Sequence, residues 1–166
     1  MTVQTELFPA EDIERPRCEV CGLMMEPGDT GQVCRHCLAD PLRVMQRIDQ
    51  TVAFFVTRQH AAARRAQDAW DGLTDEERRR WEAYQDALTR QQSGEELPYA
   101  VERRLAATIK AYAEQDLSTL TWGLLAMDSA QRLLDKANAD LREAEARRER
   151  KLAILREACG VHPRGL

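Results

Sequence analysis

Residues 16–41, PRCEVCGLMMEPGDTGQVCRHCLADP, decide how the rest of the chain is interpreted. They contain two Cys-x2-Cys pairs, Cys18 with Cys21 and Cys34 with Cys37. Paired thiols in a chain that is kept reduced are more often metal ligands than disulfides. Two such pairs supply the four soft ligands that a tetrahedral zinc ion prefers. We therefore predict one Zn²⁺ site that is built from these four cysteines.

The ligand set also limits the chemistry of the metal. Four thiolates leave no open position for water, so a zinc hydrolase is not expected. Two other chemistries share the Cys-x2-Cys pattern. A mononuclear iron site needs a glycine after each pair, and only the first pair has one, Gly22. A redox dithiol needs a βαβ context that is absent from the pattern. His36 can replace a cysteine as a ligand, whereas Cys159 is expected to be a spectator thiol.

The order of elements around the cysteines resembles that of the treble-clef zinc fingers. Residues 23–26 and 32–33 can form two short strands, joined by a turn at residues 27–31. The resemblance consists of three parts: a first Cys-x2-Cys turn, here called a knuckle, then a hairpin, then a second knuckle at the start of a helix. A zinc ribbon is the close alternative, because Pro41 follows the second pair by about one turn. The resemblance covers residues 16–40 and carries no activity with it.

From Pro41 onward the pattern becomes helical. Small and apolar residues recur every three or four positions over residues 41–71, which predicts a helix of about 30 residues. Thr74 and Glu77 form a capping-box pattern that predicts the start of a second helix. This helix is expected to end at Gly94.

Pro98 begins a last helical region that extends to about residue 158. We expect an interruption at residues 116–123, where poor helix formers gather. The predicted apolar seam consists of Leu117, Leu120, Leu124, Met127, Leu134, Leu141, Leu152 and Leu155. Trp70, Trp81 and Trp122 are expected to fill the core of an intramolecular bundle. Pairing of the last helix with a copy of itself, which would give a homodimer, is the competing arrangement.

The predicted fold is therefore mostly α, with a small N-terminal four-cysteine zinc finger followed by long helices in an antiparallel bundle or coiled coil. We expect a flexible tail over residues 1–15 and the finger over residues 16–40. The helical body is expected over residues 41–158, and a flexible C-terminus over residues 159–166.

Composition excludes several classes of protein. The 166 residues include 28 acidic and 24 basic side chains, so the formal charge of −4 argues against a nonspecific nucleic-acid coat. The longest apolar run, residues 52–56, is too short for a membrane span. The N-terminus also lacks the pattern of a secretory signal, so we expect a cytoplasmic protein. There is no phosphate-binding glycine loop, nucleophile elbow or His-Glu-x-x-His motif, so we predict no enzyme.

Two segments outside the finger suggest partners. The sequence QTELF at residues 4–8 resembles the short peptide with which bacterial replication and repair proteins bind the sliding clamp. The resemblance implies that Gln4, Leu7 and Phe8 make that contact. Late in the last helix there is a basic cluster that can contact DNA phosphates, or can be a solvated face with paired charges. Its members are Arg147, Arg148, Arg150 and Lys151.

These observations favour a nonenzymatic adaptor or regulator that binds a protein of the recombination, replication or transcription machinery. Its small size and richness in arginine suit a bacteriophage protein. One alternative is direct binding to DNA through the basic helical segments. Another is a structural coiled coil that associates with itself.

Overall fold

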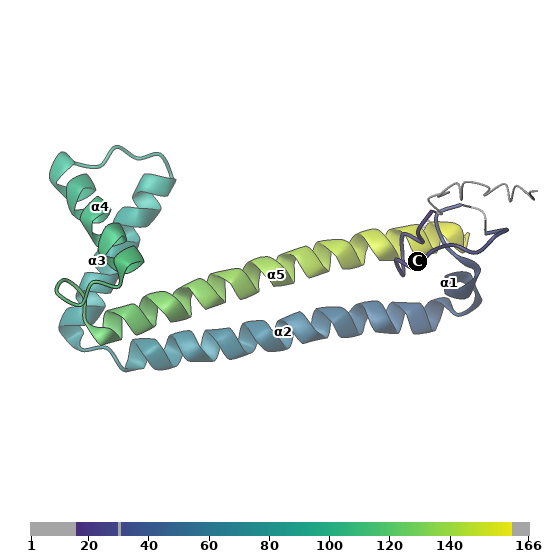
Figure 1. Cartoon of the computed structure of the whole chain (residues 1–166), viewed down its shortest axis with the longest axis horizontal. Coiled ribbons are helices and arrows are strands. Elements are labelled where there is room, and N and C mark those ends of the chain that lie inside the picture. Colours follow the sequence, from purple (N-terminus) through teal and green to yellow (C-terminus); the bar gives the residue numbers. More distant parts are fainter. Residues whose placement is uncertain (1–15, 30, 161–166) are drawn as a thin grey trace, which may run out of the picture. The chain divides into compact units, whose positions relative to one another are not determined.

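The computed structural model describes residues 16–29 and 31–160. Within these ranges the chain forms five α-helices and no strand, which confirms the mostly α class (Figure 1). The helices are α1 (Arg35–Ala39), α2 (Pro41–Asp71), α3 (Asp75–Gln92), α4 (Tyr99–Glu114) and α5 (Trp122–Ala158). The predicted tail over residues 1–15 lies outside the described residues, as does most of the predicted C-terminal segment.

The chain divides into two compact units, and the boundary between them crosses both α2 and α5. The described residues up to Gln50 and those from Ala146 onward form the first unit, here called the cysteine unit. Residues Thr51–Glu145 form the second, here called the aromatic unit.

The core of the cysteine unit combines thiols with aliphatic side chains. Ile48 of α2 and Leu152 and Leu155 of α5 are buried in the same cluster as the residues around the cysteines. The full set of buried residues is Cys18, Val20, Met25, Val33, Cys34, Cys37, Ile48, Leu152 and Leu155. The beginning of α2 thus packs against the end of α5.

The core of the aromatic unit is built around Trp81 of α3 and Tyr112 of α4, each only 4% exposed. Leu124 and Met127 at the start of α5 pack in the same cluster, and Trp70 near the end of α2 packs against it. The end of α2 thus meets the start of α5. Together with the packing in the cysteine unit, this confirms the predicted antiparallel arrangement of the long helices.

The predicted helix boundaries agree with the structure. Thr74 and Glu77 form the capping box, with the Glu77 backbone N–H donating to Thr74 Oγ1 at 3.3 Å and the Thr74 N–H donating to Glu77 Oε2 at 2.8 Å. The expected interruption separates α4 from α5. It begins at Gln115, whose φ of 53° lies in the left-handed region. Asp116 then holds the turn by accepting from the Ser118 N–H at 2.9 Å.

The two strands that the sequence predicted within the finger are wrong for the described residues. Only an isolated antiparallel bridge joins Arg17 to Met24 there. The reason lies in the first knuckle, which turns the chain back so that residues 23–25 bond to residues 16–18. The Cys18 N–H donates to the Leu23 carbonyl and the Met25 N–H to the Pro16 carbonyl, both at 2.9 Å. Residues 23–26 therefore pair with the chain before the knuckle and not with residues 32–33.

Two of the predicted core residues are also on the surface. Trp122 is 75% exposed and Leu117 is 48% exposed. Trp122 is the first residue of α5 and lies two positions before the buried Leu124, roughly 200° around the helix. Leu117 falls in the interruption, where no helical period holds its side chain toward the core.

Candidate metal centre

The four sulfur atoms of the predicted zinc site lie close together. One ligand atom from each of Cys18, Cys21, Cys34 and Cys37 lies within 4.8 Å of all the others. The Sγ atoms of Cys18 and Cys37 are 3.9 Å apart, and those of Cys21 and Cys34 are 3.7 Å apart. A tetrahedral zinc ion with Zn–S bonds of about 2.3 Å requires S–S separations of about 3.8 Å. The geometry of the thiols therefore fits a four-coordinate metal ion.

Local backbone structure fixes each pair of cysteines. Cys18 and Cys21 lie on a tight turn in which the Gly22 N–H donates to the Cys18 carbonyl at 2.8 Å. Gly22 has a φ of 76°, a left-handed conformation that glycine adopts without steric cost. Cys34 is the N-cap of α1, and Cys37 lies in its first turn with its N–H donating to the Cys34 carbonyl at 3.0 Å. The first pair thus depends on a turn and the second on a helix start.

The surroundings lower the pKa of one of these cysteines and raise the pKa of two others. Burial by itself raises the pKa of Cys18, but backbone N–H donors of Cys21, Cys34 and Val20 outweigh it and lower that pKa to about 6. The Cys34 N–H, for example, lies 3.4 Å from Cys18 Sγ. Burial raises the pKa of Cys37 strongly and that of Cys21 as well. A bound cation would offset the cost of forming further thiolates, as metal ions do when thiols ligate them.

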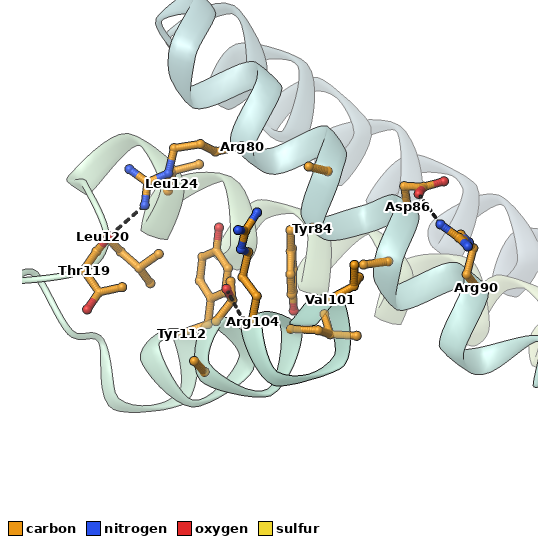
Figure 2. Close-up of a pocket in the computed structure, with 15 residues that line it drawn as sticks. Arg80, Tyr84, Asp86, Arg90, Val101, Arg104, Tyr112, Thr119, Leu120 and Leu124 are labelled. Atoms are coloured by element: carbon orange, nitrogen blue, oxygen red, sulfur yellow. Dashed lines mark hydrogen bonds and ion pairs between the residues drawn. The ribbon is translucent and has the colours of Figure 1, made fainter. Parts of the chain in front are cut away.

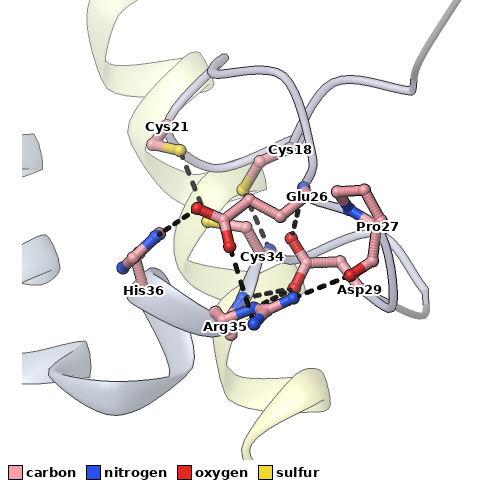
Figure 3. A network of polar contacts seen from close by, with 8 residues as sticks. All are labelled: Cys18, Cys21, Glu26, Pro27, Asp29, Cys34, Arg35 and His36. Carbon is pink, nitrogen blue, oxygen red and sulfur yellow. Dashed lines mark hydrogen bonds and ion pairs between the residues drawn. The ribbon is translucent and has the colours of Figure 1, made fainter.

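A polar network braces the loop between the two pairs (Figure 3). Asp29 Oδ1 accepts from Arg35 Nε at 2.9 Å, and its Oδ2 accepts from the Glu26 N–H at 2.9 Å. The Arg35 side chain also donates to the Pro27 carbonyl at 3.0 Å. The Arg35 hydrogen bond holds the pKa of the nearly buried Asp29 carboxyl below its usual range. The network ties residues 26–29 to the start of α1, which carries the second pair.

His36 does not join the thiol cluster. Its Nε2 lies 3.3 Å from Glu26 Oε1, and the cluster of described metal-ligating groups consists of the four cysteines (Figure 3). Cys159 is exposed and stands outside the cluster. The structure therefore places the candidate ligands where the sequence predicted them, and it places His36 in a surface contact with Glu26.

Of the other predicted site residues, the structure describes only those of the basic cluster. Gln4, Leu7 and Phe8 lie outside the described residues. Arg148 of the basic cluster forms ion pairs with Asp49 and Glu149, each at 2.6 Å. Arg150 is exposed, and Lys151 is half-buried. Arg147 also has a partner in the structure.

Sequence reasoning missed the bracing role of Asp29 and Arg35. It treated these two side chains as part of the charge of the finger. The available signal was the Pro-Gly-Asp turn followed six residues later by Arg35 at the start of a helix.

Comparison with known proteins adds no family assignment. No family model, no curated protein and no solved structure matched the chain. Among the described residues, no helix combines the length and the apolar character needed to cross a bilayer. The interpretation of the centre rests on the thiol geometry and on the residues that surround it.

Proposed function

We propose that the protein is a nonenzymatic zinc protein in which Zn²⁺ is bound by Cys18, Cys21, Cys34 and Cys37. The observation that carries this proposal is the separation of the thiols, 3.7 Å and 3.9 Å, which matches a closed tetrahedral site. Four protein ligands leave no position for a substrate or a water molecule, so the metal has a structural role. The ligand set of four soft sulfurs favours zinc among the divalent ions that prefer tetrahedral coordination.

The composition of the core supports this structural role. Three of the four candidate ligands, Cys18, Cys34 and Cys37, are themselves part of the buried cluster of the cysteine unit. A small module that has few large apolar side chains of its own gains folding free energy when a metal binds. The zinc ion would thus hold together residues 16–39, which the aliphatic residues of α2 and α5 then cover.

The partner that we propose is a protein of recombination, replication or transcription. Four large apolar side chains near the cysteines are solvent-exposed: Leu23 is 65% exposed, Met24 62%, Leu38 40% and Leu42 72%. Exposed apolar side chains of this size favour a protein surface as partner more than a phosphate backbone. The charge around them points the same way, because Arg35 is already neutralised by Asp29 and Glu26.

A capture experiment with the full chain tests the partner class. The tagged protein is incubated with nuclease-treated host extract, and the retained proteins are identified by mass spectrometry and then tested again in purified form. We expect one replication, recombination or transcription protein to bind the wild type and a Tyr99→Ala variant, which changes an exposed ring of the aromatic unit, and to lose affinity for a Leu23→Ser/Met24→Ser variant. Capture that occurs only in a parallel extract without nuclease treatment, together with salt-dependent binding of the purified protein to DNA, would favour the direct DNA-binding alternative.

A further inference from the structure

The aromatic unit contains a cavity of about 580 Å³ between α3 and α4, which Thr119, Leu120 and Leu124 also line. Its volume lies within the range of roughly 300–1,000 Å³ that is typical of pockets for small molecules. Every residue that lines it belongs to the aromatic unit, so the cavity is complete within one compact part of the chain. It is unrelated to the cysteines and goes beyond the function proposed above.

Aromatic rings form one wall of the cavity. The rings of Tyr84 and Tyr112 are stacked at a tilt of 40°, with centroids 4.9 Å apart, and Trp81 packs edge-on against Tyr112 at 5.9 Å. Leu105, Leu120 and Leu124 supply an aliphatic floor. Such a wall and floor favour a flat apolar body over a flexible polar one.

Charges in the lining are mainly positive. Arg80, Arg90 and Arg104 line the cavity together with a single carboxylate of the described lining residues, Asp86 (Figure 2). Arg90 is paired with Asp86 at 3.7 Å and with Glu95 at 2.5 Å.

The other two guanidinium groups differ in how they are engaged. Arg80 donates to the Thr119 carbonyl at 2.8 Å. Because this acceptor is uncharged, the bond does not neutralise the Arg80 guanidinium. Arg104 has no carboxylate partner anywhere in residues 16–29 and 31–160, and its side chain lies beside the tyrosines in Figure 2.

The carboxylate of Asp128 does not neutralise the positive charge of the arginines that line the cavity. Asp128 acts on both Tyr84 and Tyr112, but its carboxylate is held by Arg132 at 2.8 Å. Burial, followed by the Asp128 charge, raises the pKa of both phenols, so their hydroxyl groups stay protonated at neutral pH and are able to donate hydrogen bonds.

We propose that this cavity binds a small organic anion with a flat aromatic body. Its ring would lie against Tyr84 and Tyr112, and its carboxylate or similar group would pair with Arg104. The proposal combines an aromatic wall, a partly open cavity of about 580 Å³ and a guanidinium that has no acidic partner among the described residues. A carboxylate paired with arginine makes charge-assisted hydrogen bonds, which are the stronger kind in proteins.

Two probes with the same ring and opposite charges test the proposal. Indole-3-acetate and tryptamine are titrated into the full-length protein, with binding followed by calorimetry and by backbone amide NMR shifts. We expect indole-3-acetate to bind at one site, with shifts concentrated at the lining residues of α3 and α4. Tryptamine is expected to bind at least roughly tenfold more weakly, because its ammonium group would meet Arg104.

Two variants locate the charge that matters. Arg104→Gln keeps most of the side-chain length and is expected to weaken binding of indole-3-acetate by roughly tenfold. Arg103→Gln changes the preceding exposed arginine, which does not line the cavity, and is expected to leave binding unchanged. Circular dichroism shows whether both variants keep the fold. Equal binding of the two probes, equal effects of the two variants, or no binding of indole-3-acetate at millimolar concentration would each overturn the proposal.

Discussion

The cysteine unit and the aromatic unit bury different kinds of side chain. In the cysteine unit, three thiols share the core with aliphatic residues. In the aromatic unit, Trp81, Tyr84 and Tyr112 pack ring against ring, and leucines fill the space around them. On the function proposed above, the first arrangement depends on a metal ion, whereas the second depends on the burial of large apolar surfaces. We therefore expect the two units to lose stability under different perturbations.

The largest effect is expected from Cys34→Ser. It removes one of four ligands and leaves the other thiols without a closed site, and structural zinc contributes roughly 10–16 kcal/mol in small finger peptides. We expect zinc content by atomic emission to fall well below one per chain and the cysteine unit to lose its amide protection. Cys159→Ser, which changes an exposed thiol outside the cluster, should have neither effect. If the Cys34→Ser protein still binds one zinc tightly, the cysteine unit does not depend on a four-cysteine site, and the proposed difference between the two units is wrong.

Trp81→Ala should break the aromatic unit instead. Trp81 is 4% exposed and contacts both tyrosine rings, so its truncation is expected to cost about 3–5 kcal/mol in the free energy of unfolding. Chemical denaturation gives the free energy, and the zinc content should stay at the wild-type value. Trp122→Ala is the matched control, because Trp122 is 75% exposed. Similar losses for both tryptophans would contradict the packing described for this unit.

Thr74→Ala should have a smaller effect within the same unit. The Thr74 hydroxyl accepts from the Glu77 N–H at the start of α3, and the loss of such a cap typically costs about 1 kcal/mol. Thr57→Ala is the control, since Thr57 lies exposed inside α2 and its hydroxyl donates to the Ala53 carbonyl at 3.0 Å. Thermal unfolding should separate the two variants. If Thr57→Ala destabilises the protein as much as Thr74→Ala does, the capping box contributes nothing specific.

The smallest effect concerns pH. The Thr121 hydroxyl, followed by the Thr74 backbone and hydroxyl groups, lowers the pKa of Glu77. A lowered pKa in the folded state gives stability that is fully present above the pKa of the unfolded chain, about 4.3. That stability is lost as the pH falls through the lower folded value.

We therefore expect the aromatic unit to be less stable at about pH 3 than at about pH 5, and Glu77→Gln to weaken this dependence. Glu76→Gln, at the exposed neighbouring position, provides the comparison. Unfolding of the aromatic unit is followed at each pH by tryptophan fluorescence. An unchanged pH profile in Glu77→Gln would show that Glu77 is not the group responsible.

The sequence predicted the features that depend on local chemistry. The spacing of the cysteines indicated the ligand set, and the capping pattern at Thr74 and Glu77 located the start of α3. The interruption before α5 was predicted because poor helix formers gather there. Each of these features depends on residues that lie close together in the chain.

Other features were not predicted, although the antiparallel packing of the long helices was. The pairing of residues 23–25 with residues 16–18 is set by the turn at the first knuckle, which overrides the propensity of residues 32–33. The cavity needs Arg80 of α3 and Arg104 of α4 on facing helices, and no periodicity within one helix reveals that. The exposure of Trp122 follows from where α5 begins, which the sequence located only to within several residues.

The most direct test of the central claim is hydrogen–deuterium exchange of the full-length protein before and after zinc is removed by a chelator. We expect one zinc per chain at the start. We further expect that removal causes a large loss of protection at residues 18–39, while the peptides around Trp81 and Tyr112 keep theirs. A protein that contains no metal as isolated, or that keeps its protection at residues 18–39 after chelation, would contradict the claim that a structural metal holds the cysteine unit together.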